Sequence, residues 1–382
     1  MHIKKVNKSN ITRPPRELFK IEHPLNDLYH EHTYKELLKL HRGVYLMEEW
    51  WKEKNVRVNY HINEYNQYYL SGLEELAELT RKFHHMIAPQ QNWDNHLLIF
   101  GVGATQLLHA AIYALTVLHA KRSSKPGFIN ATPLYFTHQI PGYLETKDLI
   151  EAFDELSARW IPVQSAHLID ENDLVEFVTS PNNPDGALIY PVTRAKHIVH
   201  DRVNWWPCYM TDNLLDFKNN KLEEDELSIW SLPKILSFSG SRVGYAFVKN
   251  AKVAHYMQHF IITTTHGLAV DGQIRCLTAL RYLINKGRAH EYMDWLTAQL
   301  SARWQALTKI ISQTRLTLLN HAGPAAWVET AGNAQEELYD HYRIIGTYGP
   351  EYGVDDRFAR LNLLCTSDQF AELIWRLQNP FK

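Results

Sequence analysis

A lysine and an arginine stand eight positions apart in the stretch Ser231-Leu-Pro-Lys-Ile-Leu-Ser-Phe-Ser-Gly-Ser-Arg-Val-Gly-Tyr245. Small and hydroxyl-bearing residues surround Lys234, and Arg242 leads into an apolar run, residues 243–248, that is typical of a strand. A lysine that forms a Schiff base needs neighbours without competing charge, and a phosphate is bound well by a guanidinium and hydroxyls. Because surface loops of Lys, Ser and Gly are also common, the interpretation depends on the rest of the chain.

The composition is that of a globular chain with a large core and little net charge. Of the 382 residues, 45% are hydrophobic, and the formal net charge is −2. This length fits two domains, or one large domain with a smaller partner. The balanced charge gives no reason to expect binding to nucleic acid or to an anionic membrane. The sequence contains no run of about 18 apolar residues, so we expect no membrane span.

Cysteine and histidine usage argues against disulfide and metal chemistry. The three cysteines are far apart: Cys208, Cys276 and Cys365. Among the 21 histidines, His84 and His85 are adjacent, and His197 and His200 are close. Without a CxxC or HExxH pattern we expect no metal, and we interpret these histidines as surface or packing residues. The basic N-terminus lacks the apolar segment of a signal peptide, so we expect a cytoplasmic protein.

Strand-like and helical patterns alternate from residue 96 onward. The strand-like runs are 96–101, 127–131, 159–163, 174–179, 207–212, 229–232 and 243–248. The helical patterns between them include 106–119, 146–156 and 192–200. Alternation of apolar strands with helices predicts an α/β domain with a mainly parallel sheet.

A second, smaller α+β unit is predicted after Gly267. A long helical stretch, 271–313, breaks near Gly287, and two strand-like runs and a closing helix follow, at 325–329, 358–364 and 366–377. The N-terminal residues, with a helix expected around 34–49, would join this unit. We therefore predict three parts: residues 1–50, the large domain 51–275, and the small domain 276–382.

The carboxyl ends of the predicted strands carry the candidate ligand-binding residues, as open α/β sheets bind ligands there. Gly103-Ala-Thr105 opens a helix, where backbone N–H groups and a hydroxyl suit a phosphate, although a plain tight turn has the same form. Tyr135, followed by Phe136, can stack on a flat ring or simply pack in the core.

Three further polar residues follow or interrupt apolar runs. Asn183 lies in Ser180-Pro-Asn-Asn-Pro-Asp-Gly186, where it can present an amide or form part of an ordinary turn. Asp212 ends a strand-like run, and a protonated ring nitrogen would satisfy it, as would a turn or helix cap. Arg360 suits a carboxylate of a substrate, or a structural ion pair.

The order of these features resembles the fold-type-I pyridoxal-phosphate (PLP) enzymes, the aspartate aminotransferase superfamily. The segments 46–54, 96–115, 234–250, 265–275 and 360–370 look like the tryptophan-aminotransferase-related and alliinase-type branch. The resemblance covers roughly residues 45–380. It implies a large domain with a mainly parallel seven-stranded sheet flanked by helices, and a smaller α+β domain.

The resemblance also implies a role for each candidate. Lys234 would form the Schiff base with PLP and move a proton, Asp212 would hold the ring nitrogen, and Tyr135 would stack on the ring. Five residues would bind the phosphate: Gly103, Ala104, Thr105, Ser231 and Arg242. Asn183 would bond the ring oxygen. Arg360 and Asn183 would bind the substrate, with Arg360 at its carboxylate. A homodimer is implied, with the site at the interface and Tyr65 or Tyr68 lent by the partner.

Two departures from the family pattern flank the expected reactive centre. The family usually has a tyrosine three residues after the aspartate, where this chain has Leu215, and Pro233 directly precedes Lys234. We expect a PLP-dependent aminotransferase that converts an L-amino acid into a 2-oxo acid. The alternatives are a β- or γ-elimination, replacement or cyclisation enzyme with the same cofactor, and a non-catalytic protein of this fold, against which the intact Lys234 argues.

Overall fold

The computed structural model describes residues 37–41, 44–60, 64, 70–87, 92–120, 127–130, 159–160, 163–206 and 227–381. From Leu38 onward the described residues form one compact unit. The N-terminal arm predicted before residue 37 therefore lies outside the described residues, as do the helix predicted at 146–156 and the strand predicted at 207–212.

A seven-stranded sheet forms the centre of the large part of the chain. Its order is β2 (Leu97–Val102), β8 (Val243–Val248), β7 (Leu227–Ser231), β6 (His197–Asp201), β5 (Leu174–Thr179), β3 (Gly127–Asn130) and β4 (Arg159–Trp160). Only β8 is antiparallel to its neighbours; the other pairs are parallel. Strands β5, β7 and β8 are buried at every position, as expected of a sheet covered on both faces. The predicted sheet is thus confirmed.

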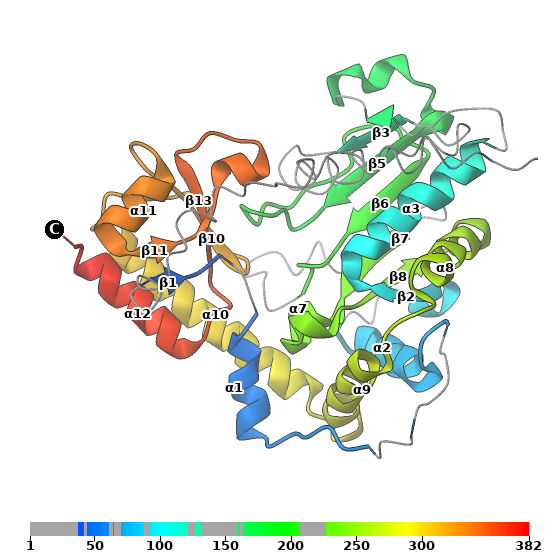
Figure 1. Cartoon of the computed structure of the whole chain (residues 1–382), viewed down its shortest axis with the longest axis horizontal. Helices are drawn as coiled ribbons and strands as arrows, with labels where there is room; N and C mark the ends of the chain where they lie inside the picture. Colours follow the sequence, from blue (N-terminus) through cyan, green and yellow to red (C-terminus); the bar gives the residue numbers. More distant parts are fainter. Residues whose placement is uncertain are drawn as a thin grey trace, which may run out of the picture. The chain divides into compact units, whose positions relative to one another are not determined.

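Helices cover both faces of this sheet. On one face α3 (Gly103–Ala120) and α8 (Ala251–Thr265) lie side by side (Figure 1) and pack with Phe177 and Ile229. Packing on the other face involves α2 (Glu74–Ile87) and α9 (Val270–Asn285) with Trp230 and Tyr245. Each sheet face therefore has its own apolar cluster, which fixes the strand ends where the candidate residues lie.

The C-terminal part contains a four-stranded antiparallel sheet and three helices, so the predicted mixture of strands and helices is confirmed, although only two of these strands and two of these helices were predicted. The sheet order is β12 (Thr347–Tyr348), β13 (Phe358–Asn362), β10 (Ala325–Glu329) and β9 (Thr317–Leu318). The helices are α10 (Ala289–Ile311), α11 (Ala334–Tyr342) and α12 (Ser367–Gln378). Helices α9 and α10 are separated near Gly287, and a capping box at Thr366 starts α12, so both predicted boundaries are confirmed.

Two predicted helices are wrong. Residues 34–49 were expected to be helical, but Leu38–Lys39 form β1, which pairs with β11 (Ile344–Ile345), and helix α1 is Leu46–Glu53. Residues 192–200 were also expected to be helical, but His197–Asp201 form β6 between β5 and β7. In each case long-range backbone pairing overrides local pattern, and the adjacent β-branched pair at 198–199 favours a strand.

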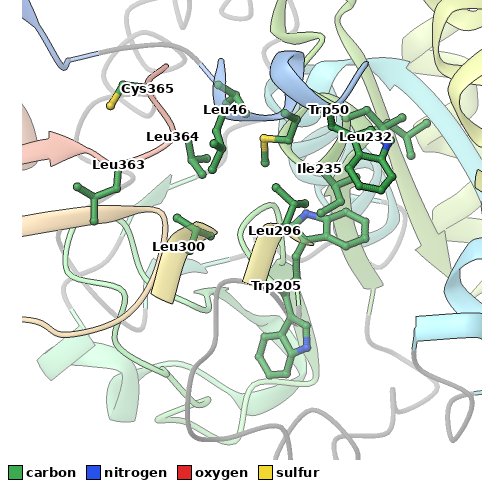
Figure 2. Packing of buried hydrophobic residues seen from close by; sticks show 14 of the residues in the cluster. Leu46, Trp50, Trp205, Leu232, Ile235, Leu296, Leu300, Leu363, Leu364 and Cys365 are labelled. Atoms are coloured by element: carbon green, nitrogen blue, oxygen red, sulfur yellow. The ribbon is translucent and has the colours of Figure 1, made fainter. Parts of the chain in front are cut away.

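Helix α1 packs in a buried cluster with residues from both the large-sheet part and the C-terminal part of the chain. Figure 2 shows side chains of α1, α7 (Leu232–Leu236), α10 and the segment 363–365 gathered in one buried cluster. Trp51 Nε1 donates to Leu236 O at 2.8 Å, and the Tyr292 hydroxyl donates to Ile235 O. Helix α1 spans the domain boundary predicted at residue 50. The division of the chain into three parts at residues 50 and 275 therefore stays a prediction. No helix in the described ranges is long and apolar enough to cross a membrane.

Candidate active site

Lys234 lies on the one-turn helix α7, directly after β7. Ser231 is the N-cap, and Pro233 lies in the first turn, where its fixed φ is favourable and its missing N–H is not needed. The pKa of Lys234 is lowered to about 8, mainly by burial; the nearby Arg360 and Arg242 add to this effect, and Asp201 opposes it. A lowered pKa raises the share of neutral amine, which is the nucleophilic form of a lysine.

Asp201 ends β6, the strand beside β7. It lies close enough to Lys234 for the positive charge of the lysine to affect the pKa of the carboxyl group. Its Oδ1 accepts a hydrogen bond from Val203 N at 3.1 Å. Its Oδ2 is buried and has no hydrogen-bond partner among the residues that the structure describes. Burial raises the pKa of Asp201 to about 6, although the Val203 N–H and Lys234 favour the charged form. A buried carboxylate oxygen without a partner is costly and suits a cationic or N–H-bearing ligand.

The sequence analysis missed Asp201 because it expected a helix at 192–200. It selected Asp212 instead, which lies outside the described residues, as does Leu215. The signal that could have found Asp201 is the run His197-Ile-Val-His-Asp201, an apolar pair followed by a carboxylate, which has the same form as the run chosen at 207–212. Tyr135, Phe136, Tyr65 and Tyr68 also lie outside the described residues.

Four of the residues predicted to bind phosphate lie close together where strands β2 and β7 end and β8 begins: Gly103, Ala104, Ser231 and Arg242. Helix α3 starts at Gly103, whose φ is +74°, and a Cβ there would lie 2.6 Å from Arg242 Nη2. Gly244 pairs with Ser231, and a Cβ on Gly244 would lie 2.4 Å from Gly103 C and 2.7 Å from Ala104 N. Ser231 does not cap α7 with its side chain. A guanidinium, a hydroxyl and a helix N-terminus thus come together, a set of groups that suits a phosphate, and Thr105 follows in the first turn of α3.

Arg360 and Asn183 come from different parts of the chain. Arg360 lies on β13, and its charge is near enough to Lys234 to lower the pKa of that amine. The Arg360 Nε is buried without a hydrogen-bond partner in the described part of the chain. Asn183 is half-buried in the turn after β5, whose shape is held by a bond from Asn182 Nδ2 to Asp185 Oδ1 of 2.8 Å. No group of His, Cys, Asp or Glu within the described ranges could hold a metal ion.

Comparison with known proteins finds relatives along nearly the whole chain. The family model described as Allinase (Alliinase_C) matches residues 41–381. Tryptophan aminotransferase-related protein 3 of Arabidopsis thaliana is 30% identical over 335 residues, which are 82% of this chain and 70% of that protein. Alliin lyase 2 of Allium sativum is 24% identical over 375 residues, 89% of this chain and 76% of that protein.

Solved structures share the fold at low sequence identity. YbdL from Escherichia coli, described as having a methionine aminotransferase function, has a TM-score of 0.69 and 16% identity, and the match covers 96% of this chain and 99% of that one. A double mutant of Thermus thermophilus aspartate aminotransferase has a TM-score of 0.64 and 14% identity, with 98% and 99% covered. These likenesses, with the sheet order above, confirm the predicted fold type I.

Proposed function

Because this chain belongs to the allinase family, a branch of the fold-type-I PLP-dependent enzymes, we propose that it is an aminotransferase that converts an L-amino acid into a 2-oxo acid. One observation carries the proposal: at the carboxyl edge of the sheet, the Asp201 carboxylate lies close enough to Lys234 for each group to affect the pKa of the other, and its buried Oδ2 has no hydrogen-bond partner among the described residues. Burial disfavours the charge of both groups more strongly than their mutual attraction favours it. Such costly placements are typical of functional sites.

The residues present fit PLP. A protonated pyridine nitrogen would satisfy Asp201 Oδ2, and Gly103, Ser231 and Arg242 would bind the phosphate. When bound, PLP supplies an electron sink that makes the Cα–H of an attached amino acid acidic. Asp212, predicted earlier for the nitrogen, is replaced by Asp201 in this proposal, because Asp201 lies in the strand next to the one that carries Lys234.

Each remaining residue has a role that its position supports. Lys234 would hold the cofactor covalently, and its free amine would accept the proton from the substrate Cα. Arg360 would bind the substrate carboxylate, and Asn183 would also contact the substrate. The third residue after Asp201 is Asn204, which is buried, so an amide stands where the family usually has a tyrosine. We propose that Asn183 and Asn204 both face the ring oxygen, and that a homodimer completes the site.

Replacing Lys234 with alanine is the direct test of this assignment. We expect kcat/KM to fall roughly 10⁴-fold, because the covalent holder and the proton acceptor are both lost. The purified wild type, reduced with borohydride and digested, should carry the cofactor on the peptide that contains Lys234, as read by mass spectrometry. Label on another lysine, or none after loading with PLP, would remove the basis of the proposal.

The reaction type is decided by products of a single turnover with a panel of L-amino acids. An aminotransferase yields a 2-oxo acid and leaves pyridoxamine phosphate on the enzyme. Because relatives include alliin lyases, elimination is the second candidate, in which a β- or γ-substituent is expelled and no pyridoxamine phosphate accumulates. Release of ammonia and the expelled group, without pyridoxamine phosphate, would replace our proposal with this alternative.

The phosphate site is tested by substituting Gly244 with alanine. The new Cβ would meet backbone atoms of Gly103 and Ala104 at 2.4 Å and 2.7 Å, so the start of α3 must move. We expect the dissociation constant for PLP to rise about 10-fold or more, and the stability to fall by about 1–3 kcal/mol. The matched control is Gly240→Ala, since no atom lies within 4 Å of a Cβ there. Equal PLP affinities for the two variants would argue against a phosphate at this place.

A further inference from the structure

The Gln106 side chain links helix α3 to two neighbouring elements beside the candidate phosphate-binding residues. Gln106 is the fourth residue of α3, which starts at Gly103. Its Oε1 accepts a hydrogen bond from Val102 N, at the end of β2, at 2.6 Å. Its Nε2 donates to Thr264 Oγ1 at 2.8 Å and to Thr265 Oγ1 at 3.1 Å, on the last two residues of α8. One side chain thus joins the strand before α3 to the end of a second helix.

The partners of the Gln106 amide fix its orientation. A threonine hydroxyl has a single proton, and both threonines donate theirs within α8. Thr264 Oγ1 donates to Phe260 O at 2.9 Å. Thr265 Oγ1 donates to Ile261 O at 3.0 Å. Toward Gln106 both hydroxyls can therefore only accept, whereas the backbone N–H at the end of β2 can only donate. A flipped amide would lose all three hydrogen bonds.

These bonds hold both ends of the segment Gly103-Ala-Thr105, to which we assign phosphate binding. Val102 precedes the segment and Gln106 follows it, and the bond between them closes the start of α3. The first N–H groups of a helix have no partner inside the helix, and no acidic side chain lies in the first turn of α3. Because the Gln106 oxygen accepts from the strand, it does not compete with a ligand for these N–H groups.

Strand β8 lies directly against the same segment. A Cβ on Gly244 would lie 2.4 Å from Gly103 C, and a Cβ on Gly103 would lie 2.6 Å from Arg242 Nη2. A shift of the first turn of α3 would therefore change the distance between its N–H groups and the Arg242 guanidinium. A phosphate bound by both needs each of them at hydrogen-bond distance at the same time.

We propose that Gln106 is a positioning residue, which holds the first turn of α3 at the distance from Arg242 at which both bind the phosphate of the cofactor. This inference rests on the proposed function, in which PLP is bound here. Gln106 acts through the backbone of Gly103-Ala-Thr105 and does not itself contact the phosphate. Its effect should therefore be large for a ligand that carries the phosphate and small for one that lacks it.

The test compares PLP with pyridoxal, which lacks the phosphate and has the same aldehyde for Lys234. Gln106→Met keeps the length of the side chain and adds no charge, but it removes the amide. Visible absorbance titrations of the cofactor-free protein give both dissociation constants. We expect the constant for PLP to rise roughly 10-fold, the size expected for lost hydrogen bonds, and that for pyridoxal to stay within about twofold. A merely structural role would shift both constants alike.

Variants of α8 separate positioning from direct contact with the phosphate. The double variant Thr264→Val, Thr265→Val removes both acceptors and leaves Gln106 in place, so PLP binding should weaken and pyridoxal binding should not. If Gln106 contacted the phosphate itself, this variant would keep the wild-type affinity for PLP, and the positioning role would be wrong. The matched control is Gln258→Met, which removes an α8 amide that donates to Leu70 O at 2.8 Å and should change neither constant.

Arg242→Ala separates this inference from the proposal beneath it. The guanidinium is assigned to the phosphate itself, so its loss should weaken PLP binding more than pyridoxal binding. If Arg242→Ala does so and Gln106→Met does not, the role of Gln106 is wrong and the phosphate site stands. If neither variant does so, or the wild type binds PLP no more tightly than pyridoxal, the phosphate site itself fails.

Discussion

The Asp201→Asn variant is expected to lose about 10³-fold in kcat/KM while its cofactor-free form becomes more stable. The loss follows from charge: an amide does not hold the ring nitrogen in its protonated form, so the electron sink weakens. The amide keeps the size of the side chain and an oxygen that can accept from Val203 N, so the fold is retained. PLP content, measured by absorbance, should stay above half of the wild-type value, since the phosphate contacts and Lys234 remain.

The gain in stability follows from the raised pKa of Asp201. The folded chain holds the Asp201 proton up to about pH 6, whereas an unfolded aspartate loses it near pH 3.8, so stability falls as the pH rises between these values. Above pH 6 the buried carboxylate destabilises the cofactor-free chain by on the order of 3 kcal/mol. Asparagine carries no such charge. Thermal unfolding of the two cofactor-free proteins at pH 5 and pH 8 should show a larger difference at pH 8.

Asp212→Asn is the matched control, since Asp212 was the residue selected from sequence. We expect it to keep at least about a third of the wild-type kcat/KM and to leave the unfolding temperature unchanged. A result in which Asp212→Asn loses activity about 10³-fold and Asp201→Asn does not would return the ring nitrogen to Asp212. It would also mean that the unpartnered Oδ2 of Asp201 has another explanation.

The two aspartates illustrate what local pattern can and cannot predict. Lys234, Arg242 and the turn at Gly103 could be selected from sequence because each lies within a few residues of the strand that positions it, and their roles stay predictions. The choice between Asp201 and Asp212 depends on which segment fills the place between β5 and β7, and that is decided by backbone pairing between residues far apart in sequence. Both segments offer an aspartate at the end of a short run, so periodicity does not separate them.

The surroundings of Arg360 were beyond sequence analysis for a similar reason. The arginine itself was predicted as a carboxylate ligand because a charge in an apolar strand needs a partner. Its neighbour Trp327 is defined only by the register of β10 and β13, which are joined by a long connection that includes α11.

A buried histidine gives the second large effect, a loss of stability in mild acid. His84 is completely buried on α2, and its Nε2 bonds with the Tyr245 hydroxyl. Its ring lies 4.7 Å from Trp230, the residue before Ser231, in an edge-to-face contact. Burial lowers the pKa of His84 to about 3, with smaller contributions from His85 and Arg81. The histidine therefore stays neutral in the folded chain at any pH that the protein tolerates.

The sign of the pH effect follows from this lowered pKa. Below pH 6.5 the unfolded chain takes up a proton at His84 and the folded chain does not, so the free energy of unfolding falls as the pH falls toward 3. The loss approaches 1.4 kcal/mol per pH unit, or on the order of 2 kcal/mol between pH 6.5 and pH 5 and 4 kcal/mol near pH 3. Urea titrations of the cofactor-free Asp201→Asn protein, which lacks the opposing effect of the Asp201 carboxylate, at pH 8, 6.5 and 5 should show the midpoint moving downward only in the acid part of this range.

Two variants isolate the contribution of His84 from that of the carboxylates. His84→Phe keeps an aromatic ring among Trp93, Trp230 and Phe247 but removes the titrating group. We expect it to be less stable than wild type at pH 8, because the Tyr245 hydroxyl loses its partner, and to lose less stability than wild type on moving to pH 5. His85→Phe removes an exposed histidine whose Nε2 lies 3.1 Å from Asp94 Oδ1, and should keep the wild-type dependence. If His84→Phe has the same dependence on pH as wild type, the acid sensitivity lies elsewhere, and the aromatic layer beneath Ser231 and Lys234 tolerates a protonated His84.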